Sequence, residues 1–180
     1  SGPMLDRVMR AARLDKRLYT ELFFDAAATG DAVLLVAGIY GTLYLALVIG
    51  ANLTFGVVGF IGILLSGLIG WLIVSGGLWL AGTKLFEGSA RGATVVRLTG
   101  FSHVPLAVLV LAPFVGSILS DVVVAAALIW FVAAIAAAAR VLFDFDTQKS
   151  ISSALLAVAL WWVVQLIGIG DGLTSLLRFF

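Results

Sequence analysis

The sequence has no cysteine and a single histidine, His103. Without cysteine, neither a disulfide nor a thiolate metal site can form, and the redox compartment stays undecided. A metal site needs several His, Asp or Glu side chains that converge on one point, and one histidine with scattered carboxylates does not provide them. The formal net charge is only +1, which argues against a nucleic-acid partner. We therefore expect no metal, no cofactor and no nucleic acid.

Recognisable catalytic motifs are also missing. The nucleophile motif Gly-x-Ser-x-Gly does not occur. Residues 168–171 spell Gly-Ile-Gly-Asp, which resembles a signature of intramembrane aspartyl proteases, but that chemistry needs two carboxylates at one site. The companion motifs of such proteases do not occur, and Gly170 and Gly172 fit the end of a helix instead. The sequence therefore predicts a protein that is not an enzyme.

Long parts of the chain lack any charged side chain. No Asp, Glu, Lys or Arg occurs in residues 32–83, 98–120, 122–139 or 151–170, and a helix crosses the hydrocarbon core with roughly 20 apolar residues. The first run is long enough for two crossings, with a turn among the turn-forming residues at 50–56. The fold class is therefore all-α, a polytopic integral membrane protein with a five-helix transmembrane bundle. Its predicted spans are 32–50, 57–82, 98–113, 121–140 and 151–170.

Basic residues gather in alternate connections between these spans. Cytoplasmic loops of membrane proteins are enriched in Lys and Arg. With five spans, ten basic residues fall on the side of the N-terminal segment, and only Arg178 falls on the opposite side. The ten are Arg7, Arg10, Arg13, Lys16, Arg17, Lys84, Arg91, Arg97, Arg140 and Lys149. We therefore expect a cytoplasmic N-terminus and an external C-terminus, and the asymmetry also supports the count of five.

Residues 1–31 form a predicted cytoplasmic segment ahead of the bundle at 32–170, and residues 171–180 a short external tail. Ser1, Gly2 and Pro3 look like a protease-cleavage scar. Further on, apolar residues recur at helical spacing with arginines between them, a pattern typical of an interfacial helix. Residues 15–17 interrupt this stripe, so two short helices fit as well as one. Such helices either lie on lipid or pack across the mouth of the bundle, and the sequence does not distinguish the two.

Polar side chains within the predicted spans are few. Pro105 has no N–H to donate to the preceding turn and should kink the third span, so residues 100–105 are expected to be irregular. His103 either hydrogen-bonds a neighbouring carbonyl or serves as a proton- or ligand-responsive group. Gln165 in the fifth span fits a hydrogen bond between helices. If the protein holds a cavity, we expect Ser102, His103 and Gln165 to line it.

The junction of the second and third spans resembles a known family. Residues 80–88 read LAGTKLFEG and residues 95–105 read VVRLTGFSHVP. This resembles the Yip-domain family, the Ypt/Rab-interacting membrane proteins, which typically have five helices, a cytosolic N-terminus and a Gly-aromatic pair followed by Pro early in helix three. Gly100, Phe101 and Pro105 match that pattern. The short N-terminal segment resembles prokaryotic members, which implies a prokaryotic plasma membrane, or endoplasmic reticulum and Golgi only for a eukaryotic chain. The GTPase partner of the eukaryotic branch is not carried over.

The resemblance implies a non-enzymatic membrane organiser or adaptor, in membrane trafficking or membrane shaping, that binds a protein partner or anionic lipid at its cytoplasmic face. The basic residues expected on that face are Lys84, Arg91, Arg97, Arg140 and Lys149. The alternative is a small transporter or channel with a water-filled cavity near His103 and Pro105. The adaptor hypothesis predicts a dry core instead. Both place the chain in a lipid bilayer and leave a homo-oligomer open.

Overall fold

The computed structural model describes residues 2–166, and within them every regular element is a helix. Two short helices, α1 (Gly2–Ala12) and α2 (Lys16–Phe24), precede the bundle. The bundle consists of α3 (Ala28–Gly50), α4 (Val57–Leu80), the π-helical turn η1 (Ala81–Leu85), α5 (Gly92–Phe101), the 3-10 helix η2 (Val104–Phe114), α6 (Ser117–Phe143) and α7 (Thr147–Leu166). The end of the predicted fifth span and the predicted tail at 171–180 lie outside the described residues.

Five helical segments are long and apolar enough to cross a membrane, which confirms the predicted all-α membrane fold. They cover Ala28–Gly50, Val57–Leu85, Gly92–Phe114, Ser117–Phe143 and Thr147–Leu166. Several begin before the charge-free runs because polar residues at their ends remain helical. Asp31, for example, lies in the first turn of α3, where a carboxylate is favoured by the positive end of the helix dipole.

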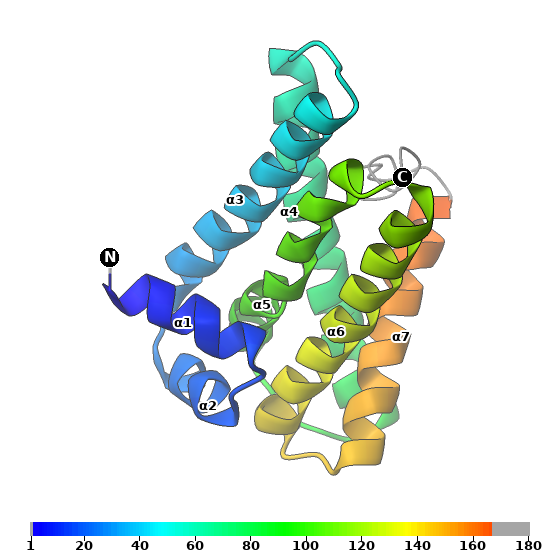
Figure 1. Cartoon of the computed structure of the whole chain (residues 1–180). Coiled ribbons are helices and arrows are strands. Elements are labelled where there is room, and N and C mark those ends of the chain that lie inside the picture. The colour runs from blue at the N-terminus through cyan, green and yellow to red at the C-terminus, as the bar shows by residue number, and fades with distance from the viewer. Residues whose placement is uncertain (1, 167–180) are drawn as a thin grey trace.

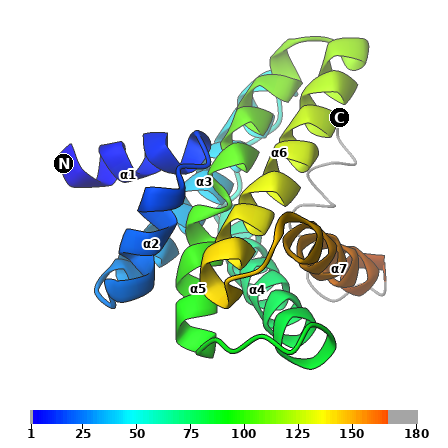
Figure 2. The same cartoon turned by 90° about the horizontal axis from the view of Figure 1, so that it is seen from below.

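The five spans run up and down beside one another (Figure 1). α6 packs on η2 and α7, and α4 packs on α3, α5 and α7. α2 packs on α5 and α6 near one end of the bundle. α1 extends sideways, so that the N-terminus points away from the bundle (Figure 2). The α4–α5 and α6–α7 connections lie at the same end as α2 (Figure 1), so this end gathers the charged segments of the chain.

The third span changes helix type near its middle. α5 ends at Phe101, and η2 begins at Val104 with Pro105 in its first turn. Proline cannot continue the α-helical hydrogen bonds but fits the first turn of a new helix. The irregular backbone predicted for residues 100–105 therefore lies where α5 gives way to η2. A 3-10 helix rises about 2.0 Å per residue against about 1.5 Å for an α-helix, so η2 covers more of the membrane with fewer residues.

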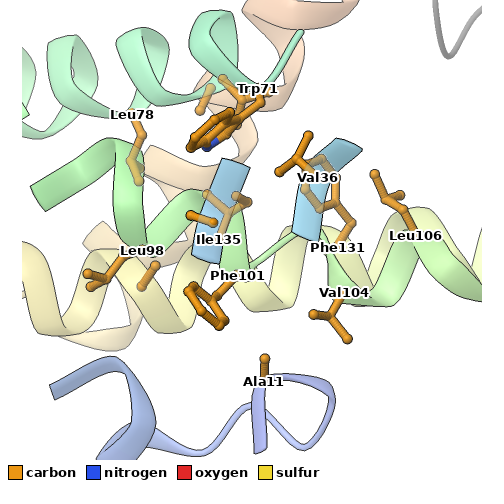
Figure 3. Close-up of a cluster of buried hydrophobic side chains, with 14 of the residues drawn as sticks. Ala11, Val36, Trp71, Leu78, Leu98, Phe101, Val104, Leu106, Phe131 and Ile135 are labelled. Atoms are coloured by element: carbon orange, nitrogen blue, oxygen red, sulfur yellow. The ribbon is translucent and has the colours of Figure 1, made fainter. Parts of the chain in front are cut away.

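Buried side chains of four bundle helices meet around this break (Figure 3). They include Val36 of α3, Trp71 and Leu78 of α4, Leu98 and Phe101 of α5, and Phe131 and Ile135 of α6. Gly100 permits the close approach of its neighbours, since a Cβ there would lie 2.7 Å from the Cβ of Ala32 and 3.1 Å from the Trp71 ring. The Trp71 Nε1 also donates to the Val96 carbonyl at 2.9 Å. The core is therefore tightly packed beside the Gly-Phe pair.

Candidate functional site

Ser102 lies in the break between α5 and η2 and is fully buried. Its hydroxyl is within hydrogen-bond distance of the carbonyls of Leu98 at 3.0 Å and Ala134 at 3.2 Å. A third contact, at 3.4 Å, reaches the Tyr19 hydroxyl on α2. Ser102 therefore joins α5, α6 and α2 at one point, and the protein itself supplies the partners that a buried hydroxyl needs.

His103 occupies the next position and is also buried. Its Nδ1 lies 2.7 Å from the Thr99 carbonyl oxygen. Because a carbonyl only accepts, Nδ1 carries the hydrogen and donates it. The ring packs edge to face against Phe131, with centroids 4.9 Å apart. This geometry is that of the carbonyl-bonded histidine, one of the two roles considered from the sequence, and a proton-responsive role stays a prediction.

Gln165, the third residue of the predicted cavity, lies on a different element. It is buried on α7, which packs on α4, α6 and η1, whereas the partners of Ser102 and His103 come from α2, α5 and α6. A hollow of about 630 Å³ exists in the described part of the molecule, but it lies between α1, α3 and η2 and is lined by other residues.

Arg97 does not lie on an exposed basic face, so that part of the prediction is wrong. Its side chain is buried. Nη1 donates to the carbonyls of Leu22 at 2.9 Å and Phe23 at 3.3 Å, and Nε donates to the Thr29 hydroxyl at 3.0 Å. Leu22 and Phe23 end α2, and a cation is favoured at the negative end of a helix dipole. Arg97 therefore fastens α2 to the bundle.

A sequence signal for this burial existed. Arg97 stands three residues before Gly100 and four before Phe101, and residues at these spacings share one face of a helix. Gly100 and Phe101 both belong to the buried face of α5. The count of basic residues on each side of the membrane assigned Arg97 to a connection between spans. It did not consider where the Arg97 side chain points.

The other basic residues of the predicted face are exposed. They are Lys84, Arg91, Arg140 and Lys149, here called the basic end. Within residues 2–166, only the guanidinium groups of Arg7 and Arg10 lie within 4.0 Å of a carboxylate, so the side chains of the basic end make no ion pair in this part of the chain. Lys149 Nζ lies 5.8 Å from the centroid of the Phe145 ring, a weak cation–π contact. The charges of the basic end therefore face outward.

Arg7 and Arg10 form an ion-pair network that sequence reasoning missed. Arg7 reaches three carboxylates, those of Glu21 at 3.1 Å, Asp25 at 2.7 Å and Asp31 at 3.1 Å. Arg10 pairs with Glu21 as well, at 2.9 Å. The contacts of Arg10 with Asp6 and Asp15 complete the set. Two guanidinium groups thus share five carboxylates and hold α1 against α2 and the foot of α3.

The network lowers the pKa of three of its carboxylates, those of Asp15, Glu21 and Asp25. Hydrogen bonds from Arg10 and Arg7 lower the pKa of Glu21, and the hydrogen bond from Arg7 lowers the pKa of Asp25. The backbone N–H of Arg17, followed by Arg10, lowers the pKa of Asp15, which caps the start of α2 at 2.9 Å. The network therefore carries an excess of negative charge at neutral pH.

A comparison with protein families identifies the family of the chain. Residues 6–169 match the family model described as the Yip1 domain. The chain belongs to this family. The match begins within α1 and extends past the end of α7, so α2, Arg97 and the Gly100–Phe101 pair all lie inside the Yip1 domain. No curated protein and no solved structure matches the chain. The resemblance drawn from the sequence is confirmed.

Proposed function

We propose that this Yip1-domain protein is a non-enzymatic membrane organiser that binds an anionic partner, lipid head groups or an acidic protein surface, through its basic end. The observation that carries the proposal is the set of exposed, unpaired cations at Lys84, Arg91, Arg140 and Lys149. Exposed basic residues next to a membrane attract anionic lipid by about 1 kcal/mol each. With the N-terminus in the cytoplasm, as the distribution of basic residues predicts, this end faces the cytoplasm.

The packing of the break supports an organiser over a transporter. Transporters place broken helices around hydrated sites at membrane depth. Here the polar groups at the break are buried, and Ser102 and His103 find their partners within the protein. The break instead serves to pack α2 and α6 against α5.

The proposal is tested by neutralising the basic end in nanodiscs of phosphatidylcholine and phosphatidylglycerol. The variant Lys84→Gln/Arg91→Gln/Lys149→Gln should weaken phosphatidylglycerol retention by about 3 kcal/mol, roughly 100-fold, because three exposed charges are lost. Native mass spectrometry of co-purified lipid gives the ratio. The charge-conserving variant Lys84→Arg/Arg91→Lys/Lys149→Arg is the control and should retain the lipid. Equal retention by both variants would contradict binding of anionic lipid at this end.

A further inference from the structure

A small groove lies between α2 and the last turn of α6, at the end of the bundle that gathers the charged segments (Figure 1). Its volume is about 210 Å³. The fourth span ends at Phe143, so in the bilayer the groove opens at the level of the lipid head groups. Its lining includes Lys16, Thr20 and Phe24 of α2, Arg140 of α6, and Asp144, the residue that follows α6.

Three charged side chains of this lining lack a partner within residues 2–166. Lys16, Arg140 and Asp144 are exposed, and none of these side chains lies within 4.0 Å of an opposite charge in that part of the chain. Arg140 and Asp144 have the spacing that favours an ion pair on a helix, but Asp144 adopts a left-handed conformation and α6 ends there. The groove therefore presents two free cations and one free carboxylate, a surplus of one positive charge.

The charges around the groove do not alter this surplus. Outside the lining, residues 2–31 contain four basic residues and five carboxylates, and all five carboxylates are paired with Arg7 or Arg10. Arg97 balances them, because it adds one positive charge at the end of α2. Residues 145–149 add one carboxylate and one lysine. The neighbours are thus neutral in sum, and the lining decides the sign of the site. The four basic residues are Arg7, Arg10, Arg13 and Arg17, and the five carboxylates are those of Asp6, Asp15, Glu21, Asp25 and Asp31.

The aromatic part of the lining fits the portion of a lipid next to its phosphate. Phe24 is 79% exposed and packs edge to face on Phe23, with ring centroids 5.1 Å apart. An exposed ring at this level is stabilised when apolar atoms cover it. Thr20 offers no free donor, since its Oγ1 donates to the Lys16 carbonyl at 3.0 Å. Binding of phosphate oxygens therefore falls to the Lys16 ammonium and the Arg140 guanidinium.

We propose that the α2–α6 groove binds the phosphodiester of an anionic phospholipid, with Lys16 and Arg140 on the phosphate oxygens and Phe24 against the glycerol and the first acyl carbons. Basic pockets between membrane-spanning helices on the cytoplasmic side bind anionic head groups in this way. The orientation and the class of ligand rest on the proposed function, to which the groove adds a defined site with two residues outside the basic end. Asp144 repels the bound anion and so limits the affinity of the site.

The test measures how much phosphatidylglycerol the full chain retains in nanodiscs with phosphatidylcholine, by native mass spectrometry. Lys16→Gln/Arg140→Gln should lower retention roughly 30-fold, because two charges that bind the phosphate are lost. The charge-conserving variant Lys16→Arg/Arg140→Lys should retain the lipid. Asp144→Asn should raise retention about fivefold. Impaired folding cannot produce such a gain, and asparagine tolerates the left-handed conformation at this position.

Two further measurements distinguish a lipid from a free phosphodiester. Phe24→Ser should lower retention several-fold, because the apolar contact with the lipid is lost. Soluble glycerophosphoglycerol, which carries the phosphodiester without acyl chains, should not displace the lipid. Displacement by this compound, or unchanged retention in either Lys16→Gln/Arg140→Gln or Asp144→Asn, would overturn the proposal.

The variant Lys84→Gln/Arg91→Gln/Lys149→Gln separates this site from the proposed function, because it leaves the groove intact. Loss of lipid in this variant alone would support binding along the basic end and overturn the groove. Loss in Lys16→Gln/Arg140→Gln alone would support the groove and contradict binding along the rest of the basic end.

Discussion

Arg97 shows how one side chain can join two parts of a membrane protein. Its guanidinium is buried and satisfies the carbonyls that end α2, so it replaces hydrogen bonds that the helix end cannot make for itself. The arrangement also explains why an arginine is tolerated within a span: the dipole of α2 and three oxygen acceptors stand in for a carboxylate.

Arg97→Met keeps an unbranched apolar stem and removes the donors of the side chain. The variant should lose about 2 kcal/mol of stability or more, because buried carbonyls are left without partners. Hydrogen exchange should rise in α2, residues 16–24, and stay unchanged in α7, which serves as the internal reference. Unaltered exchange in α2 would show that Arg97 does not hold this helix.

A substitution at Gly100 tests how closely the helices pack at the break between α5 and η2. Gly100→Ala places a Cβ 2.7 Å from Ala32 and 3.1 Å from Trp71, and overpacking of this kind costs about 1–3 kcal/mol. Gly76→Ala is the control, since a Cβ there meets nothing within 4 Å and alanine favours a helix. Thermal unfolding in detergent should show a lower midpoint for the first variant only. Equal midpoints would contradict the close approach of α3 and α4 at Gly100.

At the scale of the secondary-structure elements, the buried phenol of Tyr19 helps to hold α2 on the bundle. Burial raises the pKa of Tyr19 to about 12, against an ordinary value of 10.0, while the hydrogen bond with Ser102 opposes the shift. Between these values the unfolded chain loses a proton that the folded chain keeps. The stability linked to Tyr19 is therefore fully present below pH 10 and is lost as the pH rises towards 12.

Tyr19→Phe removes this titration. The free energy of unfolding of the variant should fall less between pH 9 and about 12 than that of the parent protein. Circular dichroism during denaturation in detergent measures it, and the remaining tyrosines are common to both proteins. Parallel pH curves would exclude Tyr19 as the source of the alkaline loss.

The helices themselves were predictable, whereas their ends and their contacts were not. Charge-free runs located the five spans because hydrocarbon excludes charge along a whole segment. The change from α5 to η2 was predictable from Pro105, because its missing N–H disrupts the helix only in the adjacent turn. The spacing of Arg97 to Gly100 and Phe101 indicates its buried face. Its partners on α2 and the Arg7–Arg10 network depend on how α1 and α2 fold back on the bundle, and such contacts between distant residues leave no local pattern in the sequence. Gln165 was grouped with Ser102 and His103 by polarity alone, and polarity does not specify which helices are neighbours.

At the scale of the whole molecule, the chain has a packed core and charged segments that gather at one end of the bundle (Figure 1). The break in the third span is filled by side chains of α2, α5 and α6. The network on α1 and α2 is rich in carboxylates, while the α4–α5 and α6–α7 connections expose unpaired cations. The packed break fits the proposed organiser role, because a transporter would need a hydrated site there.

The most direct measurement of this account uses the absence of native cysteine. Single cysteines at Ser102 and His103 are exposed to a membrane-impermeant thiol reagent from either side, with the exposed residues Ser89 and Ser117 as controls. The account predicts that the two buried positions resist labelling, that Ser89 reacts only from the cytoplasmic side, and that Ser117 reacts only from the other. Labelling at Ser102 or His103 would reveal an aqueous cavity and contradict the packed core on which the organiser proposal depends.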